Sequence, residues 1–266
     1  PTTTETEAPP VAPVATAPAR LAQGSKGPVV PGFIVLNAGA GTTSAQTLVS
    51  YLERQSGNVF SYNTSDGTLT RTSNRTIPGI QSALWTKDGS LAIVRYLSGD
   101  ALATINTYAI HPDGSGGFFL PQNLADVTLA SSSILTLSSG VNGSIVSSVT
   151  LDGARTATLF SSPLSSVRLG AFGYGKQLLF TKPSATLPGY AFSFSALKTP
   201  VRVAGPNRGL VALPSPLGSY VLLSYTQSSS LRLALLETKT GVVTELPVGT
   251  IADKCVWSAD EKNVFC

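Results

Sequence analysis

Apolar and polar residues alternate along this chain in a pattern that returns at a fixed interval. The run LWTKDGSLAIV (84–94) consists of apolar residues, a polar turn at Asp88-Gly89, and apolar residues again. Asp-Gly supplies the positive φ that a tight hairpin turn needs, and Leu, Ile and Trp favour extended backbone. The run therefore predicts a β-hairpin.

The same hairpin pattern recurs every 43 residues. Trp85 and Trp257 lie 172 residues apart, which is four times 43. At each step a turn is followed by an apolar strand, and the five turns are Asp88-Gly89, Ser131-Ser132, Tyr174-Gly175, Leu217-Gly218 and Asp260-Glu261. A repeat of about 40–45 residues without helical periodicity is typical of a β-propeller blade. The alternative is a β-sandwich, but the strands of a sandwich are not expected to recur at an interval that is constant to one residue.

Two further strands follow each hairpin. Alternation such as Tyr190, Phe192 and Phe194 marks strands with one face packed against a neighbour. Segments of two strands around a polar turn occupy 58–71, 103–120, 144–160, 190–204 and 231–246. We therefore expect an all-β propeller of four-stranded antiparallel blades, with five blades and the start of a sixth in the sequence.

The start of the folded part imitates a dinucleotide-binding fingerprint. An apolar run from Phe33 to Leu36 leads into Gly39 and Gly41, as in a strand that enters a phosphate-binding loop. The third glycine is missing and no amphipathic helix follows, so we reject a cofactor site. The 43-residue period instead assigns TLVSYLE (47–53) to the second strand of a first blade.

The sixth blade stops at Cys266, in its second strand. Two explanations are open: the chain continues beyond this residue, or Phe33 to Leu36 closes the ring in a mixed blade. We favour continuation, which makes the propeller domain incomplete at its C-terminal end.

Residues 1–31 differ in composition from the rest of the chain. They are rich in Pro, Thr and Ala and contain no aromatic residue, so they cannot bury enough apolar surface to offset the entropy lost on ordering. We predict a disordered, semi-extended linker at 1–31 and a propeller domain at 32–266. The alternative is that this segment is a flexible terminus without a function.

The turn sequences carry a family resemblance. WTKDG (85–89) and WSADE (257–261) resemble the WD40-like propeller repeats of bacterial envelope proteins, and 71–97 and 254–266 resemble membrane-anchored propeller proteins with Pro-rich linkers from small uncultivated bacteria. The resemblance implies a propeller in the cell envelope, and it implies no particular activity, because propellers host many functions. The third to fifth blades lack the Trp and the Asp, which argues against a repeated polar residue in the channel.

Composition narrows the range of partners. The 266 residues are 42% hydrophobic and only 12% charged, with a net charge of +4. The basic residues are thinly spread and not interleaved with aromatics, so we expect no nucleic-acid partner. The sequence contains no Met, which indicates a piece of a longer chain. It also has no apolar run of 18 residues or more, so any membrane anchor is expected outside these residues.

Residue types suited to catalysis are scarce. The single His, His111, lies in the polar turn HPDGSGG, and no G-x-S-x-G elbow or zinc-type cluster is present. Carboxylates are available at Asp88, Asp100, Asp113 and Asp126, each with an ordinary turn explanation. The sequons at Asn63, Asn74 and Asn142 are assigned no role. We expect no catalytic, cofactor or metal site.

The two cysteines are placed to form a disulfide. If the last turn is centred on Asp260-Glu261, Cys255 and Cys266 face each other across neighbouring strands. A pair so placed suits a structural bridge in an oxidising compartment. The alternative is two buried free thiols, and one extra residue in the turn would move the sulfurs onto opposite faces.

Two functional classes follow from these observations. The first is an extracytoplasmic, non-enzymatic module on a Pro-rich stalk that binds a protein or glycan with the top or side of the propeller. The second is a hydrolase or lyase, or the companion domain of one, acting on polysaccharide or peptide. Convergent carboxylates, a His or a metal at the channel would favour the second. We expect the repeat residues to be structural, namely Trp85, Asp88, Gly89, Gly175, Gly218, Trp257 and Asp260.

Overall fold

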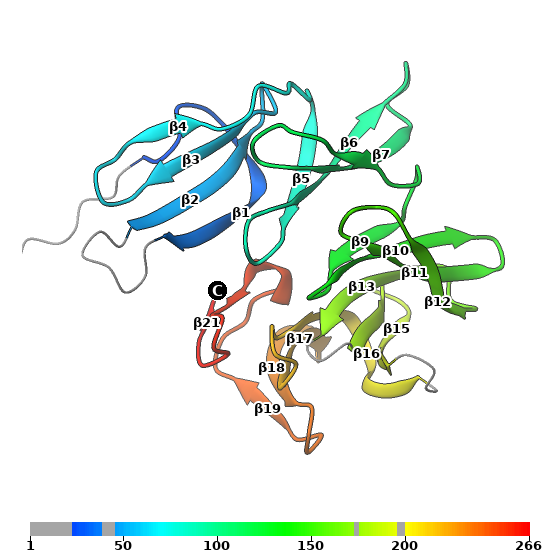
Figure 1. The fold of residues 1–266 in the computed structure, drawn as a ribbon. Helices are drawn as coiled ribbons and strands as arrows, with labels where there is room; N and C mark the ends of the chain where they lie inside the picture. The colour runs from blue at the N-terminus through cyan, green and yellow to red at the C-terminus, as the bar shows by residue number, and fades with distance from the viewer. Residues whose placement is uncertain (1–22, 39–45, 173–175, 196–199) are drawn as a thin grey trace, which may run out of the picture.

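The chain folds almost entirely into strands and turns. The computed structural model describes residues 23–38, 46–172, 176–195 and 200–266. Within these ranges there is one short 3-10 turn, η1 (Ala252–Lys254), and no α-helix. The sheets follow one another around a ring, which the colour in Figure 1 traces from blue through green to red. No helix in the described ranges has the length and apolar character needed to cross a bilayer.

The first three sheets each contain four antiparallel strands in sequence order. The first blade contains β1 (Val29–Ala38), β2 (Gln46–Glu53), β3 (Val59–Asn63) and β4 (Leu69–Arg71). The second blade contains β5 (Ile80–Trp85), β6 (Ala92–Ser98), β7 (Thr104–Ile110) and β8 (Phe118–Phe119). The third blade contains β9 (Asp126–Leu129), β10 (Ser133–Gly140), β11 (Gly143–Thr150) and β12 (Thr156–Ser162).

The fourth and fifth blades are joined through one long strand. Their seven strands are β13 (Val167–Phe172), β14 (Lys176–Thr181), β15 (Pro188–Ser195), β16 (Val201–Pro214), β17 (Tyr220–Gln227), β18 (Ser230–Glu237) and β19 (Val243–Leu246). The start of β16 pairs with β15 and its end pairs with β17. The strand is therefore the outermost of the fourth blade and the innermost of the fifth.

A two-stranded hairpin ends the chain. It consists of β20 (Val256–Trp257) and β21 (Val264–Phe265), and in Figure 1 it lies in the sector between the fifth blade and the first. We call it the last hairpin. It corresponds to the first two strands of a sixth blade.

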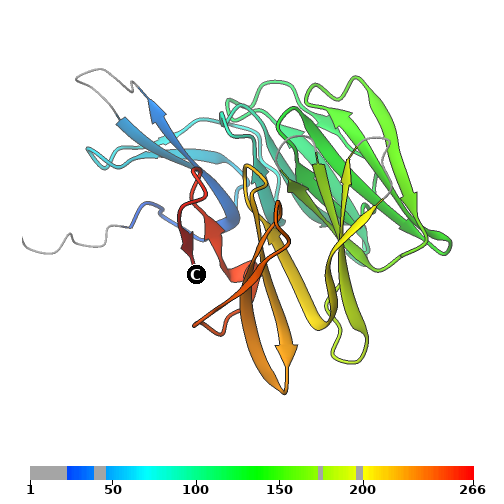
Figure 2. The same ribbon diagram turned by 90° about the horizontal axis from the view of Figure 1, so that it is seen from below.

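The predicted propeller architecture is confirmed. The innermost strands contact one another in the order β1, β5, β9, β13 and β16, and Figure 2 shows the sheets side-on as separate blades. The sheets are thus radial and not stacked in two layers, which excludes the sandwich alternative. Residues 47–53 lie in β2, as expected. The run from Phe33 to Leu36 lies in β1 and pairs with β2, so it forms the inner strand of the first blade and does not complete the last one.

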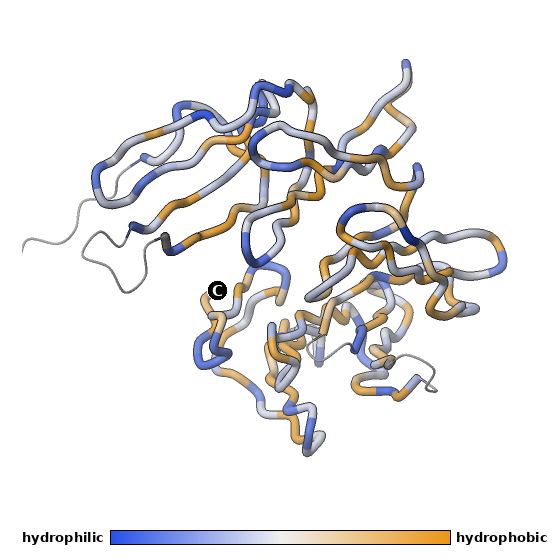
Figure 3. Tube along the Cα trace, in the orientation of Figure 1, coloured by the Kyte–Doolittle hydropathy of each residue, from blue (hydrophilic) through white to orange (hydrophobic). Residues whose placement is uncertain are grey.

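Apolar side chains hold neighbouring blades together. Each of the five buried clusters combines residues from adjacent blades, or from the fifth blade and the last hairpin. On β17, Leu222 packs toward the last hairpin, while Val221 and Leu223 pack toward the fourth blade. This follows from the alternation of side chains along a strand that is covered on both faces. Figure 3 shows these apolar stretches separated by polar turns.

The folded part begins earlier than the sequence suggested. We placed the boundary at residue 32, but β1 starts at Val29. Val30 is only 1% exposed because it packs in a cluster with Leu52 and Ile80. The predicted linker therefore extends at most to Pro28, and its residues 1–22 lie outside the described ranges.

Candidate binding site at the channel mouth

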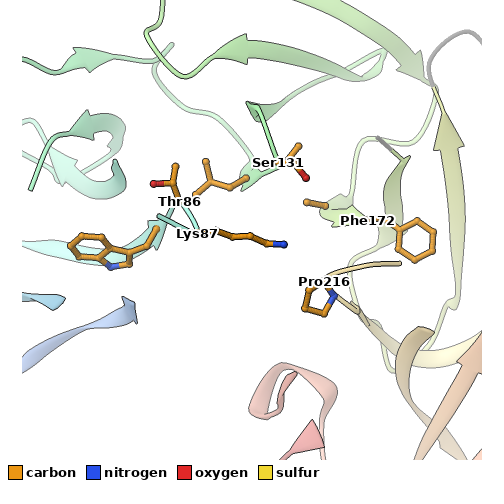
Figure 4. Close-up of a pocket in the computed structure, with 9 residues that line it drawn as sticks. Thr86, Lys87, Ser131, Phe172 and Pro216 are labelled. Atoms are coloured by element: carbon orange, nitrogen blue, oxygen red, sulfur yellow. The ribbon is translucent and has the colours of Figure 1, made fainter. Parts of the chain in front are cut away.

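Residues one repeat apart line a single cavity at the centre of the ring. Thr86, Leu129 and Phe172 are spaced by 43 residues, and each lies at or just after the end of the innermost strand of its blade. The ends of these strands therefore converge at the axis. The cavity has a volume of about 150 Å³. We call it the channel mouth (Figure 4), and its other lining residues are Trp85, Lys87, Ala130, Ser131, Ala171 and Pro216.

A hydroxyl at the repeat position closes three of the turns. Thr86, Ser215 and Ser258 are spaced by multiples of 43 residues, and the side-chain oxygen of each accepts a hydrogen bond from an amide five residues later. The oxygen-to-nitrogen distances are 3.0 Å to Leu91, 2.9 Å to Tyr220 and 3.0 Å to Asn263. The sequence analysis missed this feature, although its signal, Ser or Thr at the repeat spacing, is visible in the sequence.

The carboxylate of Asp88 is engaged within its own turn. Its Oδ1 accepts hydrogen bonds from the amide and the hydroxyl of Ser90, at 3.1 and 2.8 Å. Hydrogen bonding from the Thr86 hydroxyl, and then from Ser90, lowers the pKa of Asp88 to about 2. Gly89 takes φ of 69°, and a Cβ there would lie 2.7 Å from Leu36 of the first blade. The two predicted turn residues therefore shape the turn and its contact with the first blade.

Glu261 joins the last hairpin to the turn of the fifth blade. Its Oε1 accepts hydrogen bonds from the amides of Leu217 and Gly218, at 2.5 and 2.9 Å. Burial by itself raises the pKa of this carboxyl, but hydrogen bonds from Ser215, Ser219 and the Leu217 amide bring it below its ordinary value. Glu261 occupies the repeat position of Gly89 and Gly218 at φ of 58°. The equivalent Gly175 lies outside the described residues.

This contact predicts a pH-dependent contribution to stability. Because the folded-state pKa of Glu261 is lowered, its contribution is present above the unfolded pKa and is lost as pH falls through the folded value. We expect Glu261→Gln to unfold with a weaker pH dependence than the wild type between about pH 3 and pH 7. Urea unfolding over this range measures it. The matched control is Glu245→Gln, at an exposed carboxylate paired with Arg232; equal pH dependence in the wild type and both variants would contradict the prediction.

Both tryptophans connect adjacent blades. The indole N–H of Trp85 donates to the carbonyl of Gly32 in the first blade, and that of Trp257 donates to the carbonyl of Leu213 in the fifth, each at 3.3 Å. Asp260 of the last hairpin accepts a hydrogen bond from the Ser258 hydroxyl at 2.6 Å. Apart from Gly175, the predicted structural residues are therefore found in turns and blade-to-blade contacts, and of these Trp85 also lines the channel mouth.

Deeper in the channel lies a charged cluster. A second cavity of about 540 Å³ shares Leu129 and Ala171 with the channel mouth and is lined by Asp126, Arg168 and Asp253. Arg168 Nη1 lies 2.6 Å from Asp253 Oδ2, and its Nε lies 4.0 Å from Asp126 Oδ2. We call these three residues the channel triad.

Of the four carboxylates considered from the sequence, the structure places only Asp126 in the channel. Asp88 and Asp113 accept hydrogen bonds within surface turns, and Asp100 is exposed. Asp126 Oδ2 also accepts a hydrogen bond at 2.9 Å from the amide of Leu169, which is one repeat further on. The sequence analysis missed Arg168 and Asp253. Leu169 is the repeat equivalent of Asp126, and Arg168 directly precedes it in the sequence. That spacing was the signal by which Arg168 could have been found.

The channel is therefore charged and holds two carboxylates, the feature that was expected to favour an enzyme. Arg168 donates a hydrogen bond to Asp253, and Asp126 accepts hydrogen bonds from the amides of Val127 and Leu169. Acid–base catalysis requires a group positioned to exchange a proton with a substrate. His111 lies in a turn, with its Nδ1 3.0 Å from the carbonyl oxygen of Ser90. Among the residues that the structure describes, no three His, Cys, Asp or Glu side chains are grouped to hold a metal ion.

The last hairpin has the expected register. Val256 pairs with Phe265 and Trp257 with Val264, and the sulfurs of Cys255 and Cys266 are bonded at 2.14 Å. Cys255 is 9% exposed and packs in the cluster between the fifth blade and this hairpin. The bridge therefore ties Cys266 to this cluster, and neither cysteine lines the channel mouth.

Comparison with known proteins supports the fold and not a function. No protein-family model matches the chain, and no curated protein matches it in sequence. Among solved structures, TolB from Acinetobacter baumannii is similar with a TM-score of 0.53 and 12% identity, over 87% of this chain and 56% of TolB. Oligogalacturonate lyase from Vibrio parahaemolyticus has a TM-score of 0.55 and 8% identity, over 90% of this chain and 78% of the lyase.

A third similar structure, Porphyromonas gingivalis dipeptidyl peptidase 4, has a TM-score of 0.52 and 11% identity, over 85% of this chain. The chain spans 35% of that peptidase and 56% of TolB. At these identities the likeness establishes the propeller fold alone, because one fold supports unrelated activities.

Proposed function

We propose that this protein is a non-enzymatic binding or scaffold module that holds a protein or glycan at the channel mouth. The observation that carries the proposal is the cavity itself, which residues from four successive blades line. A concave site on a rigid scaffold, mostly apolar with a few polar groups, is the usual form of a binding site. In the deeper cavity Arg168 is paired with Asp253 at 2.6 Å, whereas the mouth is lined by Lys87, which has no carboxylate within 4.0 Å among the described residues.

An extracytoplasmic location is part of this proposal. The disulfide of the last hairpin supports an oxidising compartment, where such bonds persist. The resemblance of the turns to envelope propellers points to the same place. In the full-length protein, the Pro-rich segment would then act as a stalk that holds the propeller away from a membrane anchor.

A hydrolase or lyase, or the companion domain of one, is the second candidate. One observation that favours it is that Asp126 and Asp253 line the same cavity in the channel. The other is that this chain spans only 35% of the length of dipeptidyl peptidase 4. On this alternative, Asp126→Asn would abolish turnover of a polysaccharide or peptide by the full-length protein. Unchanged turnover in that variant would show that Asp126 has no catalytic role.

Blocking the channel mouth tests the binding proposal. We expect Ser131→Trp to weaken binding of ligands selected from a peptide display library or an oligosaccharide array by at least about tenfold, which is about 1.4 kcal/mol. Ser131 is exposed at the rim of the cavity, so the indole fills the mouth without disturbing a buried core. Fluorescence anisotropy measures the affinity.

The matched control is Val141→Trp in the turn between β10 and β11. Val141 is fully exposed and does not line the channel mouth, so this variant adds the same side chain elsewhere on the third blade. If the Ser131→Trp and Val141→Trp variants bind the ligand with equal affinity, the channel mouth is not the binding site.

A further inference from the structure

The ammonium group of Lys87 has no counter-ion in the channel mouth. Figure 4 shows the Lys87 side chain extending into the cavity toward Ser131, Phe172 and Pro216. Within the described ranges, no carboxylate lies within 4.0 Å of its Nζ. A positive charge is therefore aimed at the position that a ligand would occupy.

The repeat does not require a charge at this position. The residues at the same place in the later repeats are Ala130, Gly173, Pro216 and Ala259. Turns form in the third and fifth blades and in the last hairpin without a cation there. Lys87 is thus unnecessary for the turn, and its charge makes one side of the channel mouth different from the others.

Nearby charges leave Lys87 available to a ligand. The carboxylate of Asp88 is turned back onto Ser90 and held there by two hydrogen bonds. In the described ranges, two cations line the deeper cavity: Arg168, which is paired with Asp253 at 2.6 Å, and Arg95, whose Nη2 donates to the carbonyl of Leu124. A ligand anion that enters the channel mouth therefore meets the ammonium of Lys87 before it reaches either guanidinium.

The walls of the cavity favour a protein side chain over a sugar. Leu129, Phe172 and Pro216 are apolar, and the Trp85 N–H and the Thr86 hydroxyl already make hydrogen bonds within the protein. A sugar ring carries a hydroxyl on most of its carbons, and these walls offer few hydrogen-bond partners for them. A cavity volume of about 150 Å³ leaves room for one acidic side chain.

We propose that the channel mouth binds an aspartate or glutamate side chain of a protein partner, with Lys87 as its charge partner. This inference rests on the proposed function and specifies its ligand. The methylene groups of the acidic side chain pack on Leu129 and Phe172, and its carboxylate accepts a hydrogen bond from the ammonium. Because the mouth is open to solvent, the attraction is screened by salt, and binding weakens as ionic strength rises.

The test uses short fluorescent peptides that differ at one central residue, Glu, Gln or Lys, in an otherwise uncharged sequence with blocked ends. We expect the wild type to bind the Glu peptide at least about tenfold more tightly than the Gln peptide. Lys87→Gln should remove this preference, and Lys87→Glu should reverse it in favour of the Lys peptide. The matched control is Lys239→Glu in the exposed turn between β18 and β19, which changes the net charge equally and should keep the Glu preference.

The outcomes separate this inference from the proposed function. Equal binding of all three peptides, still blocked by Ser131→Trp, would reject the role of Lys87 and retain the mouth as a binding site. Binding of an acidic oligosaccharide, lost in Lys87→Gln, without binding of the Glu peptide would reject the protein ligand and retain the charge role. Binding of neither probe, with no ligand found in the library or on the array, would overturn both.

Discussion

Replacing Gly32 by alanine is expected to destabilise the propeller by about 2 to 5 kcal/mol. Gly32 takes φ of 108°, and a Cβ at this position would lie 1.9 Å from the carbonyl oxygen of Ala83 on β5. A left-handed backbone costs a non-glycine residue about 1–2 kcal/mol, and a forced shift of packed elements costs about 1–3 kcal/mol. The atom in the way belongs to backbone, so the two blades must separate.

The same substitution should disturb the channel mouth. The carbonyl of Gly32 accepts the hydrogen bond from the indole of Trp85, which lines the cavity. Displacing the first blade from the second therefore breaks this bond and frees Trp85. We expect Gly32→Ala to lower ligand affinity as well as the urea midpoint, with tryptophan fluorescence as the readout of unfolding.

Gly79→Ala is the matched control for Gly32→Ala. Gly79 also has a positive φ, 76°, but a Cβ there would meet nothing within 4 Å. The control therefore carries the backbone cost of about 1–2 kcal/mol without the clash. Equal losses of stability in the two variants would show that the close approach of the first and second blades at Gly32 does not matter.

The second large effect concerns the disulfide of the last hairpin. We expect Cys255→Ser with Cys266→Ser to lower the free energy of unfolding by about 3 kcal/mol or less. The bridge closes a short loop, because its cysteines are 11 residues apart, and a short loop limits the entropy that the bridge removes from the unfolded chain. Part of the loss comes from Cys255, which packs at 9% exposure in the cluster of the last hairpin.

Reductant provides the control for this prediction. It should lower the urea midpoint of the wild type toward that of the double variant and leave the variant unchanged. A thiol titration of the unfolded, unreduced protein should find no free thiol. Two titratable thiols per chain would contradict the disulfide, and a reductant effect of equal size in the double variant would show that the loss has another cause.

The sequence by itself determined the blades and their register. The 43-residue repeat, the Asp88-Gly89 turn and the alternation of apolar residues identified the hairpins and the outer strands. The pairing of Val256 with Phe265 follows from the turn at Asp260. Apart from the repeat interval, which is read directly along the chain, these features are local. Each depends on residues a few positions apart, whose turn chemistry and side-chain alternation are readable along one strand.

Only the tertiary structure decided which blades contribute to each site. Arg168 meets Asp126 and Asp253, and Lys87 points into a cavity that also contains Pro216. Such contacts join residues tens of positions apart, so they depend on the distance and rotation between blades, which the packing of side chains on both faces of each sheet sets. The pattern of one repeat specifies a blade, and the contacts between blades place Lys87 at the channel mouth.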